Sequence, residues 1–325
     1  MKPMNLIKIW SIFCLTSLGL LTQGCVADDL SVCGVSMHFK YTRNIDGVDK
    51  FASSINTINL YVFNEEGIFV EEYTEAKDSL PQDFTVFLNL TPGVYDFVAW
   101  GNLGDDYECP TFEKGVTRLS DAQLSLKRNA ENTVSTLPGT LFHGGIFRKE
   151  ILSLDLQMNQ PLEMNMIKDT KEIKIISSGL AIDDPTKAAE FEYGCSITSR
   201  NGDYRFDNSI TGDTRLQYIP RETIEGDDNQ LVSDFVIMRE PSDRSTASRL
   251  IVNRNSPSGE SEEELVNVDL VPILLALAQE RDLELMDNFE IELFFDFTHS
   301  TFSINIPGWD SESNTGSLGV VGGRW

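Results

Sequence analysis

The chain has 325 residues, of which 41% are hydrophobic and 24% are charged, and its formal net charge is −25 at pH 7. Such an excess of acids excludes a nucleic-acid partner, because affinity for phosphates comes mainly from Lys and Arg. The apolar content excludes a disordered chain, and the length favours two domains over one small core.

The first 24 residues have the pattern of a signal peptide. Lys2 and Lys8 provide the positive start, and residues 9–21 form a largely apolar run that is too short to span a bilayer. Removal of residues 1–24 takes away two lysines and no acid, so the net charge of the remaining chain falls from −25 to −27. The pattern predicts export from the cell.

A cysteine comes directly after this leader: Cys25 follows the small residue Gly24. The arrangement resembles a lipobox, in which the thiol receives a diacylglycerol and the chain is cut before the cysteine. Leu21 stands one position earlier than the usual pattern places its aliphatic residue, and an ordinary secretory signal is the alternative. Two or more acyl chains on one residue give a stable membrane anchor. We therefore predict lipidation at Cys25 and attachment to a membrane.

Of the other cysteines, Cys14 leaves with the signal, and Cys33, Cys109 and Cys195 remain. An oxidising compartment allows one bridge and leaves one thiol over. We favour the Cys33–Cys109 pair, since both lie in the same half of the chain. The spacings, with no clustered His, do not fit a zinc site, and we expect no cofactor.

The sequence between the leader and residue 160 is rich in strand signals. Gly67 and the pair at residues 92–93 are predicted turns, the first closing a hairpin. The predicted strands are residues 36–41, 57–63, 68–73, 83–90 and 94–100.

A break in composition near residues 158–161 precedes a second half of the same style. One helix is predicted over residues 270–279, with Pro272 in its first turn. The predicted strands are residues 172–177, 191–197, 231–238, 249–252 and 288–297. We predict an all-β protein of two tandem antiparallel β-sandwich domains, residues 25–160 and 161–325, with one short helix in the second.

Several short runs, in order along nearly the whole chain, carry a family resemblance. They are residues 28–33, NIDGVDKF at 44–51, INLYVFNEEGIFV at 58–70, PGVYDFVAWGN at 92–102, LFHG at 141–144, DTKEI at 169–173 and INIPGW at 304–309. Together with the lipobox they resemble the fimbrial anchor lipoproteins of Bacteroidales, which hold major and minor fimbriae to the cell.

The resemblance implies transthyretin-like sandwiches, a place at the base of a type V pilus and fimbrillin or another pilus subunit as partner. The acidic pair Asp28–Asp29 resembles the signal that directs such lipoproteins to the surface of the outer membrane. Edge strands of a sandwich present unpaired N–H and C=O groups, so a strand of another chain can be added there. An anchor that caps one end of a fibre would also limit its length.

No pattern typical of an enzyme is present, and we predict that the protein is not an enzyme. His38, His143 and His299 are isolated and are more simply packed or solvent-facing rings than ligands. Residues 46–49 match only a fragment of a calcium loop. The acidic run at residues 259–264 is predicted to be a solvated loop before the helix.

Two tryptophans suggest a second function, binding of glycans or of a host surface. Trp309 lies in the last strand region, and Trp325 ends a glycine-rich tail, residues 316–325. Exposed aromatic side chains would suit a glycan- or host-binding surface lipoprotein, which is the alternative to a fimbrial anchor. The glycines make ordering of the tail costly, so we expect it to be free without a partner.

Overall fold

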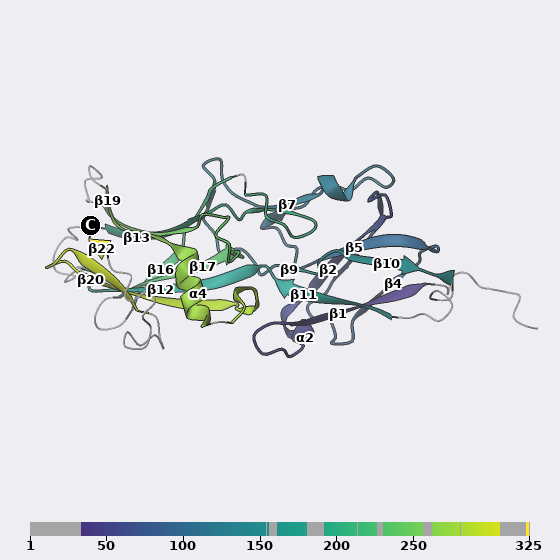
Figure 1. Cartoon of the computed structure of the whole chain (residues 1–325), viewed down its shortest axis with the longest axis horizontal. Coiled ribbons are helices and arrows are strands. Elements are labelled where there is room, and N and C mark those ends of the chain that lie inside the picture. Colours follow the sequence, from purple (N-terminus) through teal and green to yellow (C-terminus); the bar gives the residue numbers. More distant parts are fainter. Residues whose placement is uncertain are drawn as a thin grey trace, which may run out of the picture.

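The computed structural model describes residues 34–153, 155, 161–180, 192–212, 214–225, 230–255, 262–279, 281–305 and 323–324. It is built mostly of β-strands, as predicted. The strands form two layered units that follow one another along the long axis of the molecule (Figure 1). In the described part of the chain, no helix is both long and apolar enough to cross a membrane.

The first unit is an eight-stranded sheet in the order β3-β2-β5-β9-β11-β1-β4, with β10 also paired to β5. Its strands are β1 (Val35–Arg43), β2 (Thr57–Asn64), β3 (Phe69–Ala76), β4 (Thr85–Leu88), β5 (Gly93–Gly101), β9 (Phe142–His143), β10 (Phe147–Ile151) and β11 (Pro161–Lys168). Strand β9 has only two residues and joins β5 to β11. From this joint the sheet separates into two layers, β3-β2-β5-β10 and β11-β1-β4, which face each other (Figure 1).

The alternation seen in the sequence creates the core between these layers. Along β1 the buried residues are every second one, beginning at Val35, and the residues between them are partly exposed. The main contributions come from both layers: Val35, Met37, Phe39, Ile58, Leu60, Phe97, Met164 and Met166. The short helix α2 (Phe51–Ser54) adds Phe51 to the same cluster.

Two glycines allow the sheet to separate after β9. Trp100 on β5 pairs with His143, whereas Phe97 pairs with Phe147, so one extra residue is accommodated between β9 and β10. Gly145 has φ +73°, a conformation that favours glycine. A Cβ atom at Gly144 would lie 2.2 Å from the sulfur of Met164. The close approach of these strands therefore requires glycine there.

The second unit has two sheets, in the orders β16-β17-β12-β20-β21-β22 and β19-β18-β13-β15-β8. Its strands are β8 (Thr133–Val134), β12 (Thr170–Ser178), β13 (Glu192–Ser199), β15 (Leu216–Tyr218), β16 (Arg221–Glu225), β17 (Gln230–Met238), β18 (Arg249–Asn255), β19 (Glu262–Asp269), β20 (Asn288–Asp296), β21 (Thr301–Asn305) and β22 (Gly323–Arg324). Their buried side chains form one apolar cluster with Tyr61, Val98 and Trp100, from the outer side of β2 and β5.

The two halves of the chain share strands. Strand β8 of the first half pairs with β15, and a small sheet combines β6 (Tyr107–Glu108) and β7 (Gln123–Leu126) with β14 (Asp203–Arg205). The predicted boundary after residue 160 falls before β11, yet β11 lies in the first sheet, between β9 and β1. The chain passes from one sandwich to the other at Asp169, between β11 and β12.

Pairing is mostly antiparallel, but β1–β11, β12–β20 and β8–β15 are parallel. Each of these pairs joins strands that are far apart in the sequence, so no tight turn dictates their direction. A sequence pattern of alternating residues does not distinguish the two directions, and the parallel pairs were not predicted.

The predicted helix is confirmed as α4 (Leu270–Ala278), which Asp269 caps through the Val271 N–H (3.3 Å). The hairpin at Gly67 (φ +71°) is also confirmed, as β2 and β3 pair around it. The 3-10 turns η2 (Leu119–Asp121) and η3 (Leu283–Leu285) were not predicted.

Two loop predictions need correction. The acidic run was predicted to be a loop, but Glu262–Asp269 form β19, because their backbone pairs with β18 and Glu263 forms an ion pair with Arg254. The tail was predicted to be unpaired, but Gly323–Arg324 pair with Thr301 and Phe302 of β21. Backbone hydrogen bonds to this open edge compensate for ordering the glycine.

Candidate functional site

The predicted lipidation site, Cys25, lies outside the described residues, as does Cys33. Cys109 and Cys195 are free thiols in the structure. Burial raises the pKa of Cys109 to about 11, and its sulfur lies 3.5 Å from the hydroxyl of Tyr61. A raised pKa is the opposite of what a reactive thiol needs. The Cys33–Cys109 bridge stays a prediction.

His143 has a structural role at the joint of the two layers. Its ring is buried against Trp100, with ring centroids 4.4 Å apart. Nδ1 accepts the N–H of Gly145 (2.8 Å), so the proton lies on Nε2, which donates to the carbonyl of Phe206 (3.1 Å). Burial lowers the pKa of His143 to about 3. The ring is therefore neutral in ordinary buffers and links the first sandwich to the turn after β14.

The other predicted polar candidates also have structural partners. Nδ1 of His38 lies 3.1 Å from the carbonyl of Phe84, and the exposed ring of His299 pairs with Asp296 (2.7 Å). Asp49 accepts the backbone N–H of Tyr41 (2.8 Å). In the described ranges, three or more His, Cys, Asp or Glu side chains never gather closely enough to hold a metal ion.

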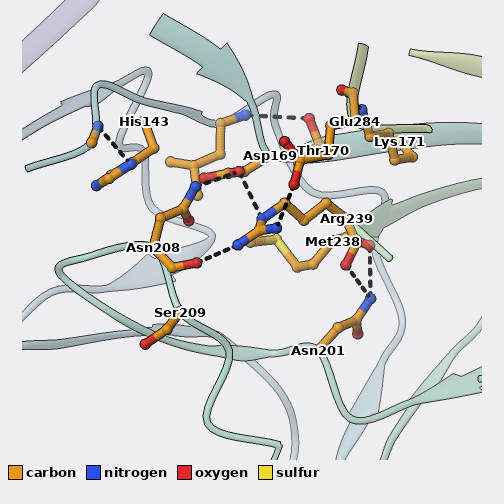
Figure 2. A network of polar contacts seen from close by, with 12 residues as sticks. His143, Asp169, Thr170, Lys171, Asn201, Asn208, Ser209, Met238, Arg239 and Glu284 are labelled. Atoms are coloured by element: carbon orange, nitrogen blue, oxygen red, sulfur yellow. Dashed lines mark hydrogen bonds and ion pairs between the residues drawn. The ribbon is translucent and has the colours of Figure 1, made fainter. Parts of the chain in front are cut away.

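The main polar cluster lies where the sandwiches meet, around Asp169 (Figure 2). The Asp169 side chain is fully buried, and its Oδ1 accepts from Asn208 Nδ2 (3.0 Å) and lies 3.2 Å from Arg239 Nε. Backbone bonds fix the same residues, since Asp169 N–H donates to Leu141 (2.8 Å) and Arg239 N–H donates to the Asp169 carbonyl (2.7 Å). Three other chain segments therefore converge on Asp169, two of them at its carboxylate.

Opposing effects set the ionisation of this cluster. Burial raises the pKa of Asp169 to about 6, while the Arg239 guanidinium and the Asn208 amide oppose the rise. The carboxylate is thus ionised at neutral pH and paired with a guanidinium that also lies 5.6 Å from the ring centroid of Tyr204. A buried ion pair of this kind is weak evidence for stability, but it fixes geometry.

A second set of contacts connects the first strand of the chain to the second sandwich. Tyr41 OH donates to Asp287 Oδ2 (2.9 Å), and Arg43 lies 3.3 Å from the Glu284 carboxylate. Lys171, whose side chain is almost fully buried, donates to the Glu284 carbonyl (2.7 Å). Burial lowers the pKa of Lys171 to about 8. We call these residues, together with Asp169, Asn208 and Arg239, the polar junction.

The polar junction was missed at the level of sequence, although a signal was present. Residues 168–172 read Lys-Asp-Thr-Lys-Glu, a charged run directly between two apolar strands. A run of this kind is more often a solvated turn, so its burial does not follow from the pattern.

Edge strands differ in how charged they are. Within the described chain, β3, β16 and β19 lie at sheet edges and each carries several charged residues, which blunt strand addition. Edge strand β4, with the sequence TVFL, and the near-edge strand β21, with the sequence TFSIN, carry none. Among the described residues, β22 pairs with Thr301 and Phe302 of β21.

These two uncharged strands lie in different sandwiches and at opposite sides of the polar junction (Figure 1). The molecule is thus an elongated pair of sandwiches, joined by buried ion pairs, with an uncharged strand near each end. Such an arrangement can bind other surfaces at its ends and offers no assembled nucleophile and base within the described part.

The family model identifies the class of protein to which this fold belongs. Residues 30–315 match the model of the fimbrillin-A associated anchor proteins Mfa1 and Mfa2, so the chain belongs to this family of fimbrial anchor proteins. The family is one of fimbrial structural proteins and not a class of enzymes.

Among curated proteins, the chain is 22% identical over 288 residues to the minor fimbrium anchoring subunit Mfa2 of Porphyromonas gingivalis, covering 85% of this chain and 84% of the relative. The solved structure of Mfa2 from that organism aligns with a TM-score of 0.67 at 20% identity, over 85% of this chain and 97% of that one. A candidate adhesin of Bacteroides ovatus aligns with a TM-score of 0.72 at 18% identity, over 88% and 97% of the two chains. These structures share its fold.

Proposed function

We propose that this protein is a lipid-anchored subunit of the outer membrane that holds a fimbrium, a type V pilus, to the cell surface. Acylated Cys25 attaches it to the membrane, and a β-strand-mediated contact attaches it to a fimbrillin or another pilus subunit. Incorporation of the anchor ends growth of the fibre at that end and so limits its length. Membership of the fimbrial anchor family over residues 30–315 carries the proposal.

The sequence supports the membrane half of the proposal. Gly24-Cys25 follows a positive start and a short apolar run, which is the pattern of a lipoprotein signal. Two or more acyl chains on one residue suffice for stable attachment, so no membrane-spanning helix is needed.

The edge of β21 supports the proposed contact with a pilus subunit. Its residues Thr301–Asn305 carry no charge, and within the described residues β22 pairs with the first two of them. Main-chain hydrogen bonds to an added strand would provide affinity, and the side chains that alternate along it would provide specificity. We place the joint with the fibre at this edge, in the second sandwich, away from the N-terminus.

Two deletions test the proposal. Without the whole protein, fimbrillin should still be made but should be poorly retained on cells, with fibres altered in length. Normal retention and length in that strain would contradict the anchor function. Without residues 316–325, β21 loses its pairing with Gly323–Arg324 and its edge is open to the fibre, so the protein should still reach the surface and hold fibres at least as well as the parent. Loss of fibres in that variant would show that the tail, and not the open edge of β21, forms the joint.

A charge on the edge strand gives a milder test of the same joint. Ser303→Lys puts a cation on β21, where it should hinder strand addition, and Thr223→Lys on the already charged edge strand β16 is the matched control. Shedding of fibres should rise in the first variant and stay at the parent level in the second. Equal shedding in both would exclude β21 as the joint.

A glycan-binding function is the second candidate. A candidate polysaccharide-binding protein of Bacteroides thetaiotaomicron aligns with a TM-score of 0.69 at 23% identity, over 84% of this chain and 96% of that one. Trp309 and Trp325, the aromatic residues that suggested this function, lie outside the described residues. Co-purification with polymeric fimbriae would favour the anchor, and glycan binding by the isolated protein would favour the alternative.

A further inference from the structure

In the described part of the first sandwich, three uncharged segments meet at one end of an otherwise strongly acidic protein, with Glu150 and Asp155 at their border. Residues 34–39, 84–95 and 151–153 contain no Asp, Glu, Lys or Arg, although 24% of the whole chain is charged. These three segments come from separate parts of the sequence. We call their meeting point the uncharged end.

Strand register places the segments together. Ser36 on β1 pairs with Phe87 on β4 and with Pro161, the first residue of β11. On the other layer, Gly93 at the start of β5 pairs with Ile151 at the end of β10. The opposite ends of β5 and β11 are joined through β9 and lead to the polar junction. All the segments of the uncharged end therefore lie at the extremity of the molecule, where Figure 1 shows β4 and β10.

Two large apolar side chains are exposed there, one on each layer. Phe87 is 44% exposed on β4, and Leu152 is 51% exposed directly after β10. The Phe87 ring lies over Gly34, where a Cβ would be 2.4 Å from the Cζ atom of the ring. The carboxylate of Asp155 lies beside this end and accepts the N–H of Leu152 (2.9 Å).

The first described residue, Gly34, lies at the same end. Gly34 is nine residues after Cys25, so an acyl group on Cys25 is within about 30 Å of the uncharged end. A rigid body held this close to a bilayer by its own chain meets the surface at high effective concentration.

We propose that the uncharged end is a docking face for a lipid surface, on which Phe87 and Leu152 rest at the boundary between headgroups and acyl chains. The inference builds on the proposed anchoring through Cys25. Phe and Leu side chains favour the boundary between headgroups and acyl chains. The absence of charge within the three segments lowers the desolvation cost of contact and leaves Glu150 and Asp155 at the border of the face. Docking would orient the long axis of the molecule away from the membrane, with β21 directed toward the fibre.

A lipid surface fits this face better than an added strand. Phe87 and Leu152 belong to different layers of the sandwich, and a strand paired along β4 would leave Leu152 uncovered. A lipid surface can contact both layers at once. The four residues of β4 also offer few main-chain bonds to a partner strand.

The test attaches the chain from residue 26 by an N-terminal His tag to phosphatidylcholine vesicles that contain a nickel-chelating lipid and a nitroxide-labelled lipid. A fluorophore is coupled to p-azidophenylalanine at position 87 or, as the matched control, at position 294. Phe294 is also an exposed phenylalanine on a strand (57%), but it lies on β20 in the second sandwich. The nitroxide should quench the probe at 87 strongly and leave the probe at 294 near its unquenched intensity.

Leu152→Asp places a charge on the docking face without altering a buried residue, and quenching at 87 should be lost. Three results would overturn the proposal: equal quenching at both positions, quenching at 87 that Leu152→Asp does not change, or quenching at 87 that disappears when fimbrillin polymer is added. The last would assign this end to the fibre. Because the tag replaces the acyl group, the result is independent of whether Cys25 is acylated in cells.

Discussion

The polar junction and the uncharged end distribute charge in opposite ways. The junction buries Asp169 and Lys171, where taking charge out of water is costly. The uncharged end is exposed yet has no ionised side chain in residues 34–39, 84–95 and 151–153. Most proteins place charge outside and exclude it from the interior.

The difference indicates two separate demands on the molecule. Buried ion pairs have strict geometry, so the junction fixes how the two sandwiches lie relative to each other. The uncharged end carries no such constraint and is suited to contact with an apolar or neutral surface. The proposed anchoring function would require both a rigid middle and ends that bind other surfaces.

The largest effect is expected at the junction. Arg239→Met should lower the free energy of unfolding by about 3–5 kcal/mol, because Asp169 stays buried without its cation. Urea unfolding measures this. Addition of Asp169→Leu to the same chain should restore most of the loss, since both charges are then absent. A double variant as unstable as the single one would show that the junction does not act as an ion pair.

The same variant has a pH dependence with a defined sign. Burial already raises the pKa of Asp169 to about 6, and loss of the guanidinium should raise it further. A folded-state pKa above the unfolded value of about 4 means that stability is lost as pH rises through the folded pKa. Arg239→Met should therefore be closer to the parent protein at pH 5 than at pH 8. An equal difference at both values would contradict this ionisation.

A smaller effect on the free energy of unfolding, confined to pH values below 6.5, is expected at His143. Burial lowers its pKa to about 3 from the ordinary value of 6.5, so below pH 6.5 the unfolded chain binds a proton that the folded chain does not. This contribution to stability is lost as pH falls below 6.5, by about 1.4 kcal/mol per pH unit. Stability curves of the parent and of His143→Gln, measured from pH 7 to pH 4, should diverge by this slope. Parallel curves would mean that His143 is protonated without cost.

The smallest effect on folding is expected at the uncharged end. Phe87→Asp and Phe294→Asp each change a half-exposed side chain on a strand, so the free energy of unfolding should fall by a similar amount in both, about 1–2 kcal/mol. The two variants should differ instead in the orientation of the tethered protein on vesicles, with only Phe87→Asp disturbed. A large loss of stability in Phe87→Asp would show that this end is packed and is not a free face.

Strands with strict alternation were the features that sequence patterns predicted best. The predicted strand at 57–63 became β2 (Thr57–Asn64), and the helix at 270–279 became α4 (Leu270–Ala278). Each has a regular apolar period and clear end signals, which act locally. Very short strands such as β8 and β9 have no such period, because their pairing partners come from distant parts of the chain.

The polar junction was harder to predict for a related reason. Residues 168–172 look like a solvated turn by composition, and only the packing of Leu141, Asn208 and Arg239 around Asp169 makes the segment buried. The uncharged end is readable in the sequence as the charge-free stretch 84–95. The sequence does not show that this stretch meets residues 34–39 and 151–153, because strand register brings the three segments together.

The most direct test of the account is the fate of fimbriae when Cys25→Ala replaces the parent protein in cells. We predict that the variant no longer incorporates labelled palmitate, leaves the outer membrane, and releases fimbriae into the medium. Ser31→Ala, six residues further along the chain, is the matched control and should keep both the label and the fibres. A Cys25→Ala protein that remains in the membrane fraction, carries the label and retains fimbriae would contradict the account.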